Sequence, residues 1–274
     1  MSIYSLSFSP TGTSAKILHG ITEGIGDILN TDIISRNLTF NPIDDIALNS
    51  GDIIIAAAPV YGGKIAPIVK QRLNGIKGND AKCIVVAVYG NRAFEKATED
   101  FASFMSDCGF LVCGAAAFIG EHSYSTADTP IAAGRPDSQD MADALDFGKE
   151  IALKIKTNGL REVDTSTLTD ESAPDESSAN FRNFVIGYQQ QQATNPIVYI
   201  PDVDFSLCDE CGVCYGVCPT EAIAPDRKEV DSTKCIKCCA CVKNCPQGAR
   251  RYSTPFAEIL SENFKFRKSP KWVL

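Results

Sequence analysis

Eight cysteines form two runs with the same spacing in the last third of the sequence. In each run two residues separate the first three cysteines, three residues precede the fourth, and a proline follows it. Three thiolates at such steps in a tight loop reach three irons of one cubane, while the fourth, beyond a change in chain direction, reaches the other cubane. The spacing therefore predicts two 4Fe-4S clusters, one held by Cys208, Cys211, Cys214 and Cys245 and one by Cys235, Cys238, Cys241 and Cys218.

Zinc sites built from Cys-x2-Cys pairs are the alternative that these thiols leave open. Zinc needs four thiolates per ion. A zinc site would not explain why each run ends in Cys-Pro or why the run occurs twice. Four thiolates leave an oxidised cluster with negative charge, so the surroundings must supply backbone amides and apolar cover. Small and apolar neighbours of that kind are Gly212, Val213, Gly216, Val217, Ile223 and Ile236.

Four of the twelve cysteines lie outside this pattern. Cys239 directly follows Cys238, so we expect its side chain to point away from a cluster that its neighbour binds. We interpret it as a packed thiol rather than a ligand. Cys83 and Cys113 fall in expected strands and Cys108 ends an expected helix, which favours inert core thiols for all three.

A second candidate site is a hydroxyl-rich loop near the start of the chain, between a strand and a helix. Its residues are Ser9, Pro10, Thr11, Gly12, Thr13 and Ser14. Hydroxyl groups and the amides of a helix N-terminus donate to anions, and the helix dipole favours negative charge there. No Gly-Lys-Ser/Thr follows, so this is not a Walker loop. The loop predicts a phosphate site, with capping of the helix as the alternative.

Two further loops combine an aromatic side chain with glycine directly after expected strands. Their residues are Pro59, Val60, Tyr61, Gly62 and Gly63 in one, and Tyr89, Gly90, Asn91, Arg92 and Phe94 in the other. Open α/β sheets bind ligands at the carboxyl ends of their strands. Glycine lets the backbone approach a flat ring closely, so both loops are candidates to hold a planar ligand.

The elements that position these loops alternate between strand and helix. Continuous apolar runs, which suit a parallel sheet covered on both faces, predict strands at 3–8, 52–60, 82–89 and 110–118. Helices are expected at about 13–29, 66–73, 93–108 and 138–156. Asp137 is the expected N-cap of the last helix, with Asp140 in its first turn. The alternation predicts a doubly wound parallel α/β sheet of five strands.

Composition divides the chain into three parts. An α/β domain is expected over residues 1–156, an acidic polar linker over 157–199, and a small α+β cysteine-rich domain over 200–274 that ends in a short helix at 255–264. Within it, residues 164–180 are polar, acidic and nearly devoid of large apolar residues, which favours a solvated and mobile connection. The alternative is that residues 181–188 and the last helix clamp the domains together.

Charge and hydropathy exclude several classes of protein. The net charge of −8 disfavours a nucleic-acid binder. No apolar run reaches the roughly 18 residues of a membrane span, and no signal-peptide pattern opens the chain. We therefore expect a cytoplasmic protein without membrane insertion.

Residues 1–156 resemble flavodoxin in their phosphate-type loop and two aromatic–glycine loops, and the cysteine runs resemble bacterial two-cluster ferredoxins. Taken whole, the chain resembles the flavodoxin–ferredoxin fusion proteins of anaerobic microbes, which are electron carriers. The resemblance implies FMN, with residues 9–14 at its phosphate and residues 59–63 and 89–94 at its isoalloxazine. Tyr61 would stack on the ring, and Ser14 stands where flavodoxins usually have threonine. Residues 114–125 and 133–137 also resemble that family.

Two residues near the expected ligand edge have open roles. His122 follows the last predicted strand and is interpreted either as a flavin contact or proton relay or as an ordinary loop histidine. Arg135 is interpreted either as a partner of phosphate or of a partner protein's acid, or as an ordinary salt-bridging arginine.

Two functions from different classes fit these features. An electron-transfer protein would couple one- and two-electron flavin chemistry to one-electron clusters, exchange electrons with redox proteins, and need no catalytic side chain. The alternative is an FMN-dependent reductase of a small molecule fed by the clusters, with residues 119–136 as its expected substrate pocket. A redox sensor ranks last, because no DNA-reading or signalling pattern occurs. The oligomeric state stays open.

Overall fold

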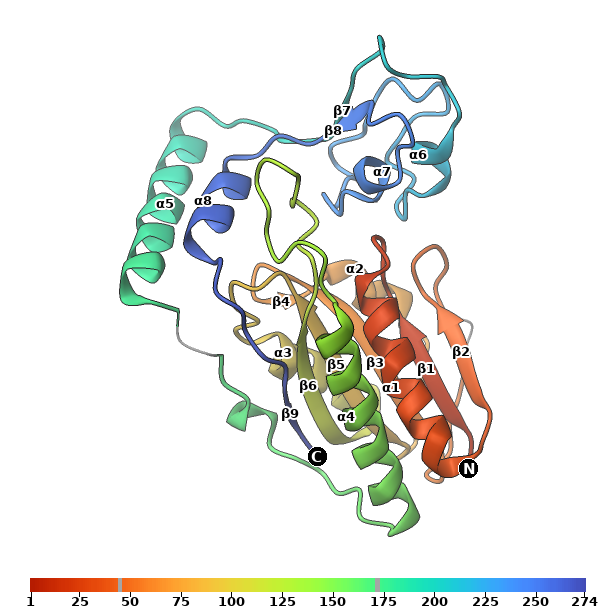
Figure 1. Cartoon of the computed structure of the whole chain (residues 1–274). Coiled ribbons are helices and arrows are strands. Elements are labelled where there is room, and N and C mark those ends of the chain that lie inside the picture. The colour runs from red at the N-terminus through yellow and green to blue at the C-terminus, as the bar shows by residue number, and fades with distance from the viewer. Residues whose placement is uncertain (44–45, 171–172) are drawn as a thin grey trace. The chain divides into compact units, whose positions relative to one another are not determined.

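The computed structural model describes residues 1–43, 46–170 and 173–274, and the chain forms two compact units (Figure 1). The first, here called the α/β unit, comprises residues 1–121, 134–171 and 267–274. The second, the cysteine unit, comprises residues 122–133 and 172–266. The chain thus passes between the units at 121/122, 133/134, 171/172 and 266/267. These units differ from the expected ranges of 1–156, 157–199 and 200–274. Residues 122–133 pack with the cysteine unit, and residues 267–274 pack with the α/β unit.

The α/β unit is built on a sheet whose described residues include five parallel strands in the order β2-β1-β3-β5-β6. These strands are β1 (Ile3–Ser7), β2 (Ile33–Asn37), β3 (Ile53–Tyr61), β5 (Lys82–Tyr89) and β6 (Leu111–Ile119). Counted along the chain, their order is 2-1-3-4-5, the flavodoxin-like doubly wound order. The predicted fold class is confirmed. Only β2 was not located from sequence, because it is an edge strand without buried residues and has no continuous apolar run.

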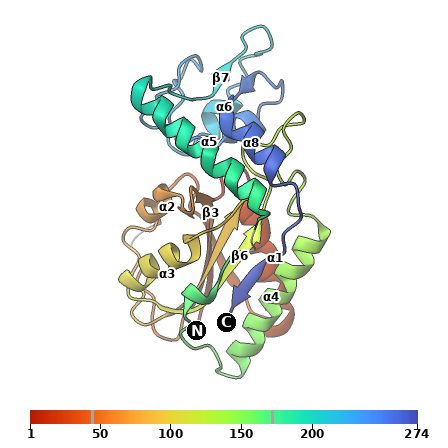
Figure 2. The same ribbon diagram turned by 90° about the vertical axis from the view of Figure 1, so that its left-hand side faces the viewer.

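Helices cover both faces of this sheet. They are α1 (Thr13–Leu29), α2 (Pro67–Arg72), α3 (Ala97–Asp107) and α4 (Ser138–Lys156). Helices α1 and α4 lie side by side on one face, while α2 and α3 lie on the other (Figures 1 and 2). A core of isoleucine, valine and aromatic side chains fills the space between the sheet and the α1–α4 layer. This burial on both faces explains why the central strands are apolar along their whole length.

Two short strands extend the sheet beyond the predicted five. Strand β4 (Lys64–Ile65) folds back on the end of β3, and β9 (Lys271–Val273) pairs antiparallel with β6. Trp272 of β9 stacks on Phe118 of β6 with ring centroids 6.2 Å apart, and its indole N–H donates to Glu150 at 3.1 Å. The end of the chain therefore belongs to the α/β unit. A segment of three residues is too short to be predicted as a strand from sequence, and it forms one here by pairing with β6.

Helices α1 and α4 approach each other closely at two glycines. A Cβ atom at Gly24 would lie 2.0 Å from the carbonyl oxygen of Leu145, and one at Gly148 would lie 2.0 Å from that of Ile21. Backbone from the two helices is therefore in direct contact, and no side chain fits between them.

Replacing Gly24 by alanine is expected to lower the free energy of unfolding by about 1–3 kcal/mol, because the added methyl forces the helices apart. Gly26 is the matched control, since a Cβ there meets nothing within 4 Å. Gly26→Ala is expected to stabilise the unit by about 0.5–1 kcal/mol through helix propensity. Urea denaturation followed by the fluorescence of Trp272, the single tryptophan, measures both variants. Equal destabilisation would contradict the close crossing.

The cysteine unit contains short regular elements. Helices α6 (Val213–Gly216) and α7 (Ala240–Lys243) carry parts of the two cysteine runs, and β7 (Asp202–Val203) pairs antiparallel with β8 (Arg250–Arg251). The small α+β domain expected here is confirmed. No helix among the described residues is long and apolar enough to cross a bilayer.

Helix α5 (Asp175–Thr194) occupies much of the expected linker. Its aromatic side chains pack on α8 (Pro255–Asn263), with the rings of Phe184 and Tyr188 lying 5.0 and 4.9 Å from that of Phe256. The polar and acidic composition favoured a solvated segment there, with packing by residues 181–188 and the last helix as the alternative; the two helices pack within the cysteine unit. The helix is instead stabilised by aromatic contacts with residues much later in the chain, which composition does not report.

The start of the expected linker also has a packed structure. Leu160 and Leu168 are buried, and the Val163 N–H donates to the carbonyl of Val112 at 3.1 Å. The short 3-10 helix η1 (Thr165–Thr167) follows, and the N–H of Ser166 donates to the Asp164 carboxylate at 3.0 Å. These residues therefore lie on the α/β unit, and the interpretation of a solvated linker does not describe them.

Candidate functional site

All four cysteines predicted to hold the first cluster line one cavity. Cys208, Cys211 and Cys214 come from the first run and Cys245 from the end of the second. Small and apolar residues complete much of the wall, including Gly212, Val213, Pro246 and Ala249. Four thiols around an apolar space are the donor set and cover that a 4Fe-4S cubane requires. The residues present fit this group.

The four cysteines predicted for the second cluster also lie near one another. Burial, followed by the effect of neighbouring thiols, raises the pKa of both Cys238 and Cys241 to about 12. Cys218 and Cys235 are among those neighbours at both positions. The Sγ of Cys218 accepts from the N–H of Ala222 at 3.2 Å, the kind of amide contact that stabilises a cluster sulfur. The fourth cysteine of each run thus lies with the first three of the other.

No three or more histidine, cysteine or acidic side chains of the described residues gather closely enough to hold a single metal ion. A single ion draws its ligands around one point. A cubane instead takes its four thiolates at four separate irons, so its ligands lie around a cavity.

The two cysteine runs share a local backbone conformation. The residues on either side of the second cysteine have positive φ in both runs: Glu210 and Gly212 at 60° and 79°, Lys237 and Cys239 at 57° and 58°. Left-handed residues at these places curl the chain tightly, which brings the thiols of one run together. Cys239 therefore occupies the position of a glycine in the first run. Its side chain is buried, as the packed-thiol interpretation requires.

The hydroxyl-rich loop connects β1 to α1, where the sequence predicted it. Gly12 is the N-cap of α1 with a φ of 86°; it supplies no side-chain cap of its own, and the first turn has no acidic residue. The Ser9 Oγ accepts from the N–H of Ala15 at 3.0 Å, so the capping alternative accounts for one N–H group. The other N–H groups of a first helical turn have no partner within the helix.

Ser14 gives a specific indication of a ligand at this loop. Its side chain is buried, and its Oγ has no hydrogen-bond partner among the described residues. A buried hydroxyl without a partner costs free energy unless a ligand or water supplies one. Nearby, a Cβ at Gly120 would lie 3.2 Å from the Cβ of Thr13, so the end of β6 closely approaches the loop. These residues fit a bound phosphate group.

The two aromatic–glycine loops contact each other. Gly62 and Gly63, with φ of 59° and 80°, form the tight turn between β3 and β4. A Cβ at Gly63 would lie 1.9 Å from Oε2 of Glu95, and the Gly63 carbonyl accepts from the N–H of Lys96 at 3.2 Å. The positive φ of Gly63 and the close approach of the Glu95 side chain both favour glycine at this position.

The aromatic residues of these loops differ in accessibility. Tyr89 and Phe94 are buried and pack edge to face, with ring centroids 5.5 Å apart. Tyr61 is partly exposed at the end of β3, next to partly exposed Pro59 and Val60. Stacking on a planar ligand is therefore a role open to Tyr61, whereas the rings of Tyr89 and Phe94 serve the core.

The second loop is held by residues that the sequence analysis did not select. The Asp170 carboxylate accepts from the N–H groups of Phe94 and Glu95 at 2.9 and 2.8 Å, and Lys268 Nζ donates to the Arg92 carbonyl at 2.7 Å. Asp170 is one acid among many in the expected linker, and Lys268 lies far along the chain. Neither carries a local signal that distinguishes it.

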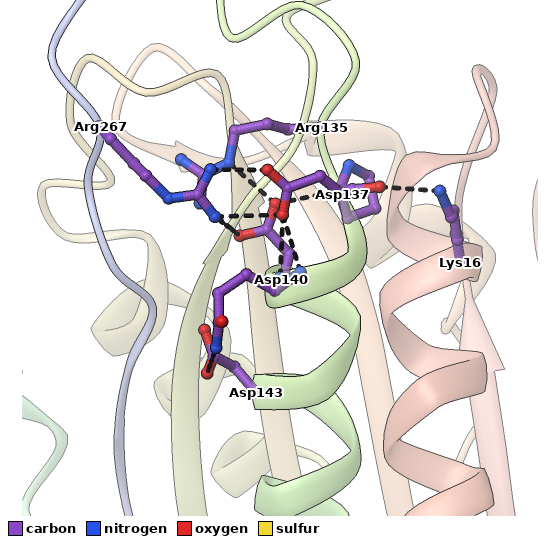
Figure 3. A network of polar contacts seen from close by, with 8 residues as sticks. Lys16, Arg135, Asp137, Asp140, Asp143 and Arg267 are labelled. Atoms are coloured by element: carbon purple, nitrogen blue, oxygen red, sulfur yellow. Dashed lines mark hydrogen bonds and ion pairs between the residues drawn. The ribbon is translucent and has the colours of Figure 1, made fainter.

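Arg135 is an internal salt-bridging residue, one of the two roles expected for it (Figure 3). Its Nε donates to Asp140 at 2.9 Å, and both side chains are buried. Asp137 is the N-cap of α4 in a capping box with Asp140, which confirms the predicted start of that helix. Arg267 donates to Asp137 at 2.6 Å and thereby holds the pKa of that carboxyl well below its ordinary value. This network anchors residue 267 to the start of α4.

His122 lies in the cysteine unit. Its Nδ1 accepts from the N–H of Tyr124 at 3.0 Å, and the two rings lie edge to face at 4.6 Å. These contacts fit a structural loop residue. The proposed contact with flavin remains a prediction.

The comparisons with known proteins found similarity for the cysteine-rich part and for the α/β part of the chain separately. Residues 200–246 match the family model described as a 4Fe-4S dicluster domain. The chain thus joins an α/β unit with the flavodoxin-like strand order to a segment that matches a 4Fe-4S dicluster domain. No curated protein matches it.

Solved structures similar to this chain include flavodoxins. A flavodoxin from Archaea is 16% identical with a TM-score of 0.41, covering 57% of this chain and 99% of its own. The two-electron reduced flavodoxin of Megasphaera elsdenii is 17% identical with a TM-score of 0.37, covering 52% and 97%. Rubredoxin oxygen:oxidoreductase of Desulfovibrio gigas is 15% identical with a TM-score of 0.39, covering 57% of this chain and 36% of its own. The strand order, rather than these scores, carries the fold assignment.

Proposed function

We propose that this protein transfers electrons between redox proteins through one FMN and two 4Fe-4S clusters. The observation that carries the proposal is the convergence of Cys208, Cys211, Cys214 and Cys245 on one apolar cavity, because these residues come from both cysteine runs. The proximity of Cys241 to the thiols of Cys218, Cys235 and Cys238 supports a second cluster. A 4Fe-4S cluster carries one electron at a time, so a domain that holds two serves electron transfer.

The flavin part of the proposal rests on the α/β unit. Its strand order is that of flavodoxin, and the buried, unpaired Ser14 hydroxyl lies in the loop that would hold a phosphate. Residues 9–14 would bind that phosphate, and residues 59–63 with 89–94 would hold the isoalloxazine, with Tyr61 on its face. Flavin exchanges one or two electrons, which would connect two-electron donors or acceptors to one-electron clusters. The residues of this chain bind, orient and cover the groups, and none is proposed to be catalytic.

Residues 122–133 are the middle of the segment 119–136 that the reductase alternative would use as its substrate pocket. The carbonyl of Ser125 accepts from Lys243 Nζ at 2.7 Å, and that of Pro130 accepts from the Ser261 hydroxyl at 2.9 Å. Ile131 packs with Leu260 in a small apolar cluster. Residues 122–133 are therefore held within the cysteine unit by their own contacts.

Iron, sulfide and acid-released flavin, measured per chain on anaerobically purified protein, test the proposal. About eight irons, eight sulfides and one FMN are expected, and reductive titration is expected to take up about four electrons. Eight irons without flavin would overturn the flavin site and leave the cluster assignment. About one iron or zinc per four thiols would overturn the clusters.

A further inference from the structure

Two residues at the junctions with the cysteine unit hold the same loop of the α/β unit. Asp170 is the last described residue before the chain leaves the α/β unit, and Lys268 is the second residue after it returns. Both bind the segment 92–95, which contains the end of the second aromatic–glycine loop and the residue after it. Two later segments of the chain thus each contribute one residue that is hydrogen-bonded to this loop.

Lys268 is buried to an unusual degree for a lysine. Its side chain is 1% exposed, and its Nζ donates to the carbonyl oxygen of Arg92 at 2.7 Å. Burying an ammonium group is costly unless it is hydrogen-bonded, and lysine is among the residues most rarely buried. A lysine in this place therefore indicates a specific role for its charge beside the loop.

Neighbouring contacts fix the position of Lys268 from both sides. Arg267 is bound to Asp137 and Asp140 at the start of α4 (Figure 3). On the other side, β9 pairs with β6 and places Lys271 Nζ 3.1 Å from the carbonyl of Thr169. The Nζ of Lys268 is thus presented to the loop by a segment that is anchored at both ends.

The loop in turn is connected to the glycine turn after β3. Arg92 forms an ion pair with Glu95 at 2.6 Å, and the Glu95 carboxylate lies against Gly63. The Asp170 carboxylate accepts the N–H groups of Phe94 and Glu95. A cation at the carbonyl of residue 92 and an anion at the amides of residues 94 and 95 together determine the conformation of this segment.

We propose that Lys268 and Asp170 are positioning residues for the flavin ring, which keep residues 90–95 in the conformation that binds it. The inference rests on the proposed function, because it assumes that this loop holds the isoalloxazine. A ligand binds more weakly when the binding-competent conformation is only partly populated, and by the same factor. A hydrogen bond to a charged group is strong enough for its loss to weaken binding about tenfold or more.

Lys268→Met is the main variant, because it removes the ammonium but keeps a long side chain. Lys265→Met is the matched control, because it removes the same charge three residues away, from an exposed position in the cysteine unit. Titration of flavin-depleted protein with FMN is expected to give a dissociation constant at least about tenfold higher for Lys268→Met and unchanged for Lys265→Met. Melting followed by Trp272 fluorescence shows that each variant is folded.

Asp170→Asn provides an independent variant on the other side of the loop, and it decides the question if Lys268→Met does not fold. It is also expected to weaken FMN. The midpoint potential of bound flavin distinguishes the two variants, because reduction adds negative charge to the flavin. The potential is expected to fall in Lys268→Met, which loses a cation, and to rise in Asp170→Asn, which loses an anion. A loss of structure alone would not produce shifts of opposite sign.

The possible results distinguish the inference from the function beneath it. Weaker FMN binding by Lys268→Met, with Lys265→Met like the wild type, supports the inference. Equal FMN affinity in these two variants, or shifts of potential in the same direction for Lys268→Met and Asp170→Asn, overturns the inference and leaves the flavin assignment in place. A wild-type protein that takes up no FMN overturns the flavin assignment itself and the inference with it.

Discussion

Replacing Cys241 by alanine is expected to halve the bound iron, from about eight to about four per chain. Cys241 lies among Cys218, Cys235 and Cys238, so its loss removes one of four thiolates from the proposed second cluster and none from the first. Iron and sulfide analysis measures the loss. After reduction, the electron paramagnetic resonance spectrum is expected to be that of one isolated cluster, without the broadening that two nearby reduced clusters produce.

Cys239→Ala is the matched control for this variant. Cys239 is a buried thiol of the same run, two residues away, and it lies outside both proposed ligand sets. Alanine has the same steric limits as cysteine at a φ of 58°, so the substitution adds no backbone strain. About eight irons are expected to remain. Equal loss of iron in both variants would show that the unit depends on packing here rather than on one ligand.

The crossed ligand assignment makes this test sharper. Cys245 stands at the end of the second run but lines the cavity of the first. Cys245→Ala is therefore expected to leave the same cluster as Cys208→Ala, and a different one from Cys241→Ala. If Cys245→Ala and Cys241→Ala left the same spectrum, each run would bind its own cluster and the crossed assignment would be wrong.

The sequence predicted those features whose signals are local. The cysteine spacing selects eight thiols before any fold is known, and apolar runs locate β1, β3, β5 and β6 to within one residue. Helices α1 and α4 begin and end at the predicted residues, because capping residues and turn residues mark their ends. Each of these signals lies within the segment that it describes.

The features that sequence reasoning did not find depend on remote partners. Helix α5 has a polar composition, and its aromatic residues contact α8. Strand β9 exists because β6 has a free edge beside it. Asp170 and Lys268 act on a loop about 76 and 176 residues away in sequence. No window along the chain contains both members of these pairs, so composition and periodicity do not report them.

Replacing Thr13 by glutamate is expected to weaken FMN binding by about a hundredfold or more, while the flavin-free protein becomes slightly more stable. Thr13 is the first residue of α1, where a negative side chain is favourable by about 0.3–1 kcal/mol because of the helix dipole. The same charge repels a phosphate in the loop. Two unit charges about 5 Å apart at an effective dielectric of about 20 interact by roughly 3 kcal/mol, which corresponds to about a hundredfold in affinity.

Comparison of FMN with riboflavin separates repulsion of the phosphate from general damage to the site. Riboflavin has the same ring system without a phosphate, so Thr13→Glu is expected to bind it about as well as the wild type does. Thr22→Glu, the same change further along α1, serves as the control and is expected to leave the affinity for FMN unchanged. Equal weakening of FMN and riboflavin by Thr13→Glu would place the ring rather than the phosphate at this loop, whereas unchanged FMN binding would exclude residues 9–14 from the flavin site.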